Sequence, residues 1–198
     1  RQRTACDLAQ LVEDVGPLDG PPLRFVAACV ASALEVLHSP ALHSVYRHLM
    51  PEALALLDNG YVCLMDLKHC ENEWRGCQTL CGSPLYFAPE MVRGEQQTSA
   101  VDMWAMGVLL YELASGESPW GSDANECDDV TLLKRIAEHT DDGLRTPSRV
   151  RALRREGEDG SPDGGSSPED TEALLELLTP LLQPAIAERH TAAAIKAH

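Results

Sequence analysis

Basic residues are scarce in this chain. Among its 198 residues there are 16 Lys and Arg against 31 Asp and Glu, which gives a net charge of −15. Nucleic acids and anionic membranes repel such a chain, so we expect neither as its main partner. Long apolar runs are also lacking: the best candidate for a membrane span, residues 101–114, is interrupted by Asp102 and Glu112. The sequence therefore predicts no nucleic acid and no membrane as partners.

Paired cysteines are missing as well. The seven cysteines include no Cys-x2-Cys pair, so the spacing favours neither a zinc site nor a disulfide framework and indicates a reducing compartment. No secretory signal is recognisable, and we expect a cytoplasmic protein. Because Arg1 opens a stretch that already looks helical, we expect a fragment of a longer protein. A hydrophobic content of 44% predicts one folded domain with a core.

A β-hairpin is predicted near the middle of the sequence. Two short apolar runs, residues 54–57 and 61–65, are joined by Asp-Asn-Gly, whose residues tolerate the positive φ of a tight turn. The two ends of such a hairpin lie side by side. Its predicted mouth gathers polar side chains that suggest a site: Arg47, His48, Glu52 and Asp66.

Helical spacing of apolar residues predicts a mainly α chain with one or two short hairpins. The stretch 98–115 is apolar around most of its circumference, which predicts a buried helix. Thr98 or Ser99 is expected to cap it. The predicted helices span residues 4–15, 23–38, 98–115, 130–139, 171–182 and 191–198.

Two irregular stretches interrupt this pattern. Residues 67–89 are polar and long enough to predict a functional surface loop. Residues 154–170 are rich in Gly, Ser and Pro, which predicts a mobile insertion. Asp170 or Thr171 is expected to cap the helix that follows.

Three motifs resemble the large lobe of a eukaryotic protein kinase. Residues 46–53, Tyr-Arg-His-Leu-Met-Pro-Glu-Ala, followed by Asp66, are similar to the family's catalytic loop and its metal-binding Asp-Phe-Gly. Residues 79–90, Thr-Leu-Cys-Gly-Ser-Pro-Leu-Tyr-Phe-Ala-Pro-Glu, resemble the end of its activation segment, and the stretch 98–115 resembles its central helix. The resemblance covers residues 1–198 and is closest to cyclic-nucleotide-dependent Ser/Thr kinases. The small β-rich lobe is expected to be absent, because no Gly-rich loop or strand lysine is found.

Three positions depart from the family pattern. The resemblance places His48 at the catalytic Asp, Met50 at the Lys that holds the phosphate, and Ala53 at the Asn that binds a second magnesium. Histidine can take a proton but cannot orient a hydroxyl as a carboxylate does. Met50 carries no charge, and Ala53 offers no oxygen. Each change is expected to cost on the order of 10²–10³ in rate, so we expect a catalytically impaired chain.

Other residues retain the chemistry that the resemblance implies. Asp66 keeps a hard oxygen for Mg²⁺, although an Asp at the end of a hairpin is also a common cap. Asp7 and Ala55 fall on the residual nucleotide side, so ATP and Mg²⁺ are expected to bind weakly or not at all. Without the small lobe, an apolar face near Ala55 and Leu67 is expected to be exposed.

A switch and an acidic groove are implied as well. Thr79 aligns with the activation-segment phosphorylation site, and Arg47 would receive the phosphate or simply tie down the loop. Glu52 and Glu112 align with acids that contact basic substrates, although ordinary solvated carboxylates explain them equally well.

Three residues are expected to hold this architecture together. The resemblance implies that Asp102 binds the backbone of the catalytic loop, since a buried carboxylate must be hydrogen-bonded. It also implies a buried ion pair between Arg189 and Glu90.

The leading hypothesis is a pseudokinase that acts as a binding or scaffold module for basic peptides or another kinase. The alternative is a Ser/Thr kinase that transfers the ATP γ-phosphate to protein, with its small lobe encoded upstream. A decayed gene product is a third hypothesis, suggested by an apparent two-residue insertion in residues 40–45.

Overall fold

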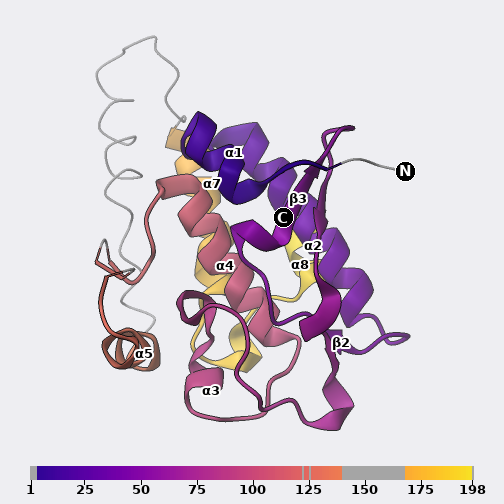
Figure 1. Cartoon of the computed structure of the whole chain (residues 1–198), viewed down its shortest axis with the longest axis vertical. Coiled ribbons are helices and arrows are strands. Elements are labelled where there is room, and N and C mark those ends of the chain that lie inside the picture. Colours follow the sequence, from indigo (N-terminus) through magenta and orange to yellow (C-terminus); the bar gives the residue numbers. More distant parts are fainter. Residues whose placement is uncertain (1–3, 122, 125, 140–167, 198) are drawn as a thin grey trace.

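The computed structural model describes residues 4–121, 123–124, 126–139 and 168–197, and the fold is mainly helical (Figure 1). The helices are α1 (Leu8–Val15), α2 (Gly20–His38), α3 (Pro89–Val92), α4 (Ala100–Ser115), α5 (Asp129–Ala137), α7 (Pro168–Leu181) and α8 (Ala192–Ala197). The strands are β1 (Thr4–Asp7), β2 (Ser44–Val45), β3 (Leu54–Leu57), β4 (Val62–Leu64) and β5 (Glu71–Asn72). Single 3-10 turns are η1 (Pro51–Ala53), η2 (Leu67–His69), η3 (Glu73–Arg75), η4 (Pro84–Tyr86) and η6 (Ile186–Glu188).

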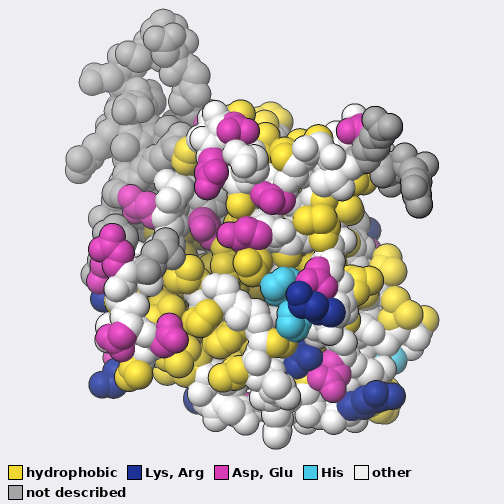
Figure 2. All heavy atoms as spheres, viewed as in Figure 1, with side chains coloured by type: hydrophobic (Ala, Val, Ile, Leu, Met, Phe, Trp, Pro, Cys, Tyr) yellow, Lys and Arg dark blue, Asp and Glu magenta, His cyan; other side chains and the backbone are white. Residues whose placement is uncertain are grey.

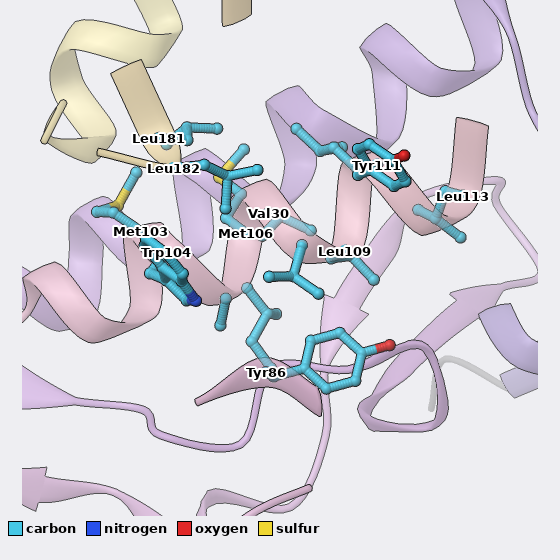
Figure 3. Packing of buried hydrophobic residues seen from close by; sticks show 14 of the residues in the cluster. Val30, Tyr86, Met103, Trp104, Met106, Leu109, Tyr111, Leu113, Leu181 and Leu182 are labelled. Carbon is cyan, nitrogen blue, oxygen red and sulfur yellow. The ribbon is translucent and has the colours of Figure 1, made fainter. Parts of the chain in front are cut away.

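Helix α4 runs through the middle of the molecule and forms its core (Figure 1). Every residue from 101 to 115 except Glu112 is buried, as expected for a helix that is apolar all round. Its side chains meet Leu181 and Leu182 at the end of α7 on one side and Tyr86 on the other (Figure 3). At Gly107 the approach is so close that an added Cβ would lie 2.8 Å from the Leu182 side chain. The predicted burial of this helix is confirmed.

The predicted hairpin is also present, as β3 and β4. Gly60 takes φ 84° in the turn, and Leu54 pairs with Leu64 at the mouth. A second small sheet pairs β2 with β5, which joins the chain before the hairpin to the chain after it. The residues on either side of the hairpin are therefore held close together.

The start of the chain differs from prediction. Residues 4–7 form strand β1, which adds to the edge of β3, whereas a continuous helix was expected over 4–15. The helix begins only at Leu8, because the Asp7 carboxylate accepts a hydrogen bond from the Gln10 N–H and caps it. The strand also covers Ala55, which is fully buried, so the expected exposure of that residue was wrong. Leu67 is exposed, as expected.

Several helix boundaries were also misplaced. The cap expected at Asp170 or Thr171 is wrong, because α7 begins at Pro168 and contains both residues. Residues 154–167 of the predicted insertion lie outside the described residues. Helix α4 begins at Ala100. Of the two residues expected to cap it, Ser99 makes no side-chain capping bond, whereas the Thr98 hydroxyl accepts a hydrogen bond from the Ala100 N–H at 3.4 Å.

Helix α2 has the length and composition of a membrane span, whereas the sequence pattern had indicated residues 101–114 as the best candidate. Within its 19 residues, Gly20–His38, an 18-residue window has a mean hydropathy of 1.3. Length and composition alone do not separate a span from a core helix, and here the helix packs against α4, α8 and β4.

Candidate functional site

Asp102, near the start of α4, holds the backbone of the loop at residues 46–53. Its Oδ2 accepts a hydrogen bond from the Tyr46 N–H at 2.7 Å, and its Oδ1 accepts one from the Arg47 N–H at 2.7 Å. The carboxylate is fully buried, so these bonds replace the water it has lost. The predicted contact is present in the structure, and it holds Arg47 at a positive φ of 61°.

His38 is a partner of Asp102 that sequence reasoning did not assign. The Nε2 of His38 lies 2.8 Å from Asp102 Oδ2, so the end of α2 joins the same cluster. The signal was slight: His38 is simply the last residue of a predicted helix.

Tyr46 fastens the loop to the hairpin. Its hydroxyl donates to the Met65 carbonyl and lies 3.4 Å from the Ala53 carbonyl. Burial raises the pKa of Tyr46 far above its usual value, so the phenol keeps the proton it donates. Through this bond the chain near His48 and Ala53 is held beside the chain near Asp66.

His48 lies beside a second imidazole. The ring centroids of His48 and His69 are 4.7 Å apart, and the buried Nδ1 of His48 has no hydrogen-bond partner among the described groups. Burial and then the neighbouring His69 lower the pKa of His48, which makes it a weaker base than an ordinary histidine. The expectation that His48 does not do the work of the catalytic Asp stays a prediction.

The positions of Met50 and Ala53 offer no polar group to a substrate. Met50 is half-buried against the apolar core, and the Ala53 side chain is buried under the hairpin. Neither can supply a charge to a phosphate or an oxygen to a metal ion.

Asp66 is bound by a residue two positions further along. It adopts a positive φ of 52°, its Oδ1 accepts a bond from the Lys68 N–H at 3.3 Å, and its Oδ2 lies 2.5 Å from Lys68 Nζ. The hydrogen bond from Lys68 holds the pKa of Asp66 below its usual value, so the carboxylate is charged. With Lys68 on this carboxylate and no oxygen at Ala53, the residues present do not fit the magnesium sites of the kinase pattern.

The Arg47 guanidinium already binds several hydrogen-bond acceptors. Its NH2 lies 3.0 Å from Glu71 Oε2, its Nε donates to the His69 carbonyl at 2.9 Å, and its NH1 donates to the Thr79 carbonyl at 3.2 Å. Only 7% of the side chain is exposed. Glu71, which sequence reasoning missed, supplies an anion to Arg47, the residue that was predicted to receive a phosphate. Thr79 is exposed. Phosphorylation of its hydroxyl stays a prediction.

Of the two acids assigned to a groove, Glu52 is the exposed one. Glu112 is partly buried and accepts a hydrogen bond from the Tyr86 hydroxyl. Burial, and secondarily the charge of Glu52, raise the pKa of Glu112. On the face of the molecule drawn in Figure 2, acidic side chains spread across the upper part. The carboxylate assigned to the nucleotide side, Asp7, is used as the cap of α1.

The predicted ion pair between Arg189 and Glu90 is present. Arg189 NH1 lies 2.6 Å from Glu90 Oε1, and both side chains are fully buried. Arg189 also donates to the carbonyls of Gln183 and Ala100, and its guanidinium lies 5.1 Å from the centre of the Trp104 ring. The pair thus ties α3 to the C-terminal part of the chain.

Comparison of the sequence with known proteins identifies relatives of this chain. A family model described as the protein kinase domain matches residues 3–198. The chain is 38% identical over 120 residues to the cGMP-dependent protein kinase isozyme 2 forms cD5/T2 of Drosophila melanogaster, covering 59% of this chain and 13% of that protein. It is 37% identical over 116 residues to human cGMP-dependent protein kinase 2, covering 58% and 15%. It is 42% identical over 97 residues to cAMP-dependent protein kinase catalytic subunit 2 of Drosophila melanogaster, covering 49% and 27%. These matches therefore cover less than a third of the length of each relative.

Proposed function

This chain belongs to the protein kinase domain family, and from that premise we propose that it is a catalytically impaired binding module, a pseudokinase that docks basic peptides. One observation carries the proposal. Asp102 holds the loop and Tyr46 holds the hairpin, while His48, Met50 and Ala53 stand where the resemblance places the three reactive groups.

Phosphoryl transfer depends on positioning and on neutralising charge. The positioning half is retained here, because the loop is bonded to α4 and to the hairpin. The groups that would neutralise charge are missing at Met50 and Ala53. The remaining carboxylate, Asp66, is paired with Lys68. A rigid frame without its reactive groups supports binding better than turnover.

The docking surface we propose is centred on Glu52. This carboxylate is exposed, and it lies close enough to Glu112 to raise the pKa of that residue. Two neighbouring acids that repel one another gain from a cation placed between them. A peptide guanidinium or ammonium group supplies such a cation, and a basic segment of another kinase would fit the same surface.

The first test is binding of an arginine-containing peptide to the chain, followed by fluorescence anisotropy. Glu52→Gln is expected to weaken binding about fivefold, as for the loss of a surface ion pair worth ~1 kcal/mol. The matched control is Glu188→Gln, an exposed acid on η6 in the C-terminal part of the chain, which should leave binding unchanged. Equal binding of a charge-reversed peptide would contradict the proposal.

The second test is phosphotransfer to the same peptide with Mg-ATP, using the longest form of the protein that can be expressed. No turnover above background is expected. Robust turnover that disappears in His48→Ala would overturn the proposal and favour the alternative, a Ser/Thr kinase with an unusual base and a small lobe upstream.

A further inference from the structure

The turn of the β3–β4 hairpin carries an asparagine that is followed directly by a glycine. Asp58, Asn59 and Gly60 are all exposed, and the turn projects beyond the ends of the two strands (Figure 1). Gly60 adopts a φ of 84°, and a Cβ added to it would meet no atom within 4 Å. The backbone conformation therefore requires this glycine, whereas packing does not. No side chain at position 60 shields the peptide nitrogen that follows Asn59.

The side-chain amide of Asn59 is held only through its oxygen. Its Oδ1 accepts a hydrogen bond from the Tyr61 N–H at 3.2 Å, and its Nδ2 has no hydrogen-bond partner among the described groups. A donor on this oxygen stabilises the negative charge that develops there when a nucleophile adds to the amide carbon. The turn thus polarises the amide carbon and leaves the amino group free to depart.

The peptide nitrogen of Gly60 is the nucleophile, once it has lost its proton. Attack of this nitrogen on Asn59 Cγ forms a five-membered imide ring, and the Nδ2 amino group leaves as ammonia. Water then adds to one of the two ring carbonyls and opens the ring, which leaves an aspartyl or an isoaspartyl residue. One water is consumed and one ammonia is released, without oxidation or reduction. Glycine favours ring closure, because it has no Cβ to restrict the backbone.

One contact of the folded turn opposes this attack. The Gly60 N–H donates to the Leu57 carbonyl at 2.8 Å, which holds the proton on the nitrogen while the turn is closed. The adjacent bond runs from the Leu57 N–H to the Tyr61 carbonyl at 2.9 Å. Hydrogen bonds at the exposed end of a hairpin open at a low free energy. We therefore expect the fold to slow the reaction relative to the unfolded chain without preventing it.

Asn72 has the opposite surroundings and serves as a control within the same chain. Its Nδ2 donates to the Leu42 carbonyl at 3.3 Å, and its Oδ1 accepts from the Trp74 N–H at 3.0 Å. The next residue, Glu73, has a side chain, and its N–H donates to the His43 carbonyl at 2.8 Å beside the β2–β5 pairing. At Asn72 both the leaving group and the nucleophile are held.

We propose that Asn59 is a site of spontaneous covalent modification in the folded protein, where it converts to an aspartyl or isoaspartyl residue through an imide with the Gly60 nitrogen. The proposal does not rest on the docking function above. Either product adds a negative charge beside Asp58, and the isoaspartyl product also lengthens the main chain of the turn by one carbon. In that product we expect the contact between the Tyr61 and Phe25 rings, whose centroids are 5.5 Å apart, to loosen.

The test is incubation of the full chain at mildly acidic and at mildly alkaline pH, followed by peptide mapping with mass spectrometry. Enzymatic methylation of isoaspartyl carboxyls measures the isoaspartyl share. Asn59 is expected to convert in the folded chain, faster at the higher pH because the Gly60 nitrogen must lose its proton, and faster again in urea. Asn72 should stay unchanged in the folded chain. Gly60→Ala should slow conversion at position 59 about tenfold, because its Cβ shields the nitrogen and restricts the backbone.

Four results would overturn the proposal. They are an unchanged Asn59 in the folded chain after the chain in urea has converted, equal conversion of Asn59 and Asn72 in the folded chain, a rate that does not rise with pH, and an equal rate in folded Gly60→Ala. Circular dichroism checks the fold of that variant, because its alanine takes a positive φ. If it does not fold, the comparison of Asn59 with Asn72 in the unaltered chain decides the question.

Discussion

Glu112 illustrates how a single residue can carry a cost that its sequence position does not reveal. It lies on the buried helix α4 and has the Tyr86 hydroxyl as a hydrogen-bond donor. Burial raises its pKa, so the folded state holds its proton more tightly than the unfolded state does.

This shift predicts a pH-dependent penalty. As pH rises from the ordinary carboxyl range to the raised pKa of Glu112, the unfolded state loses its proton while the folded state still holds it, so the free energy of unfolding falls. Glu112→Gln retains an acceptor for Tyr86 and removes the charge. We expect this variant to be more stable than the unaltered chain at pH 7 and equally stable near pH 3, where the carboxyl is protonated in both states.

Thermal unfolding at the two pH values measures this difference. The control is Glu188→Gln, at an exposed carboxylate, which should show no such gain. A Glu112→Gln variant that is less stable at pH 7 would show that the charge is compensated in the fold.

At the scale of elements, the segment from Asp66 to Glu90 has no long helix or strand of its own. It is held instead by β5 pairing with β2 and by the Arg47 side chain, which bonds Glu71 and the carbonyls of His69 and Thr79. Because these contacts come from the chain itself, we expect the segment to be ordered without a phosphate on Thr79.

Removing the counter-ion should loosen this segment. In Glu71→Gln the largely buried Arg47 charge keeps only neutral partners, which costs on the order of 1–3 kcal/mol of local stability. We expect trypsin to cleave after the exposed Arg75 about tenfold faster, since cleavage follows local opening.

Mass spectrometry of the early fragments identifies the cleavage site. The control is Glu95→Gln, which removes an exposed partner of Arg93 and should not change the rate. Unchanged cleavage after Arg75 in Glu71→Gln would mean that the backbone pairing alone orders the segment.

At the scale of the whole molecule, the ion pair between Arg189 and Glu90 connects parts of the chain that are 99 positions apart. It lies beside Trp104 of the central helix, with both side chains fully buried. Because of this contact, we expect the C-terminal helices and the 84–92 region to unfold together.

Breaking the pair should therefore destabilise the whole fold. Arg189→Met leaves the Glu90 carboxylate buried without its cation, and we expect a loss on the order of 3–5 kcal/mol in the free energy of unfolding. Lys196→Met is the matched control: it removes an exposed pair with Glu35 and should cost less than about 1 kcal/mol.

Urea denaturation measures both losses. The double variant Glu90→Gln/Arg189→Met should lose less than the sum of its two single variants, because neither charge is then left alone. Additive losses would show that the two side chains act independently.

The sequence by itself determined the buried helix α4, the β3–β4 hairpin and the family. Periodicity, turn residues and motif spacing are local properties, and they suffice for such features. Family resemblance added two contacts that are distant in sequence: the Asp102 contact to the loop, and the Arg189–Glu90 pair. Strand β1 was missed because its pairing with β3 overrode a helical pattern.

Only the tertiary structure decided what surrounds the altered positions. Lys68 lies on Asp66, Glu71 on Arg47 and His38 on Asp102, and no motif predicts these contacts. These three contacts depend on turn geometry, on the β2–β5 pairing and on which side chain remains unpaired after folding. The periodicity of the sequence predicts none of these. The sequence showed which reactive groups are lost, and the fold showed which of the chain's own charges stand beside the groups that remain.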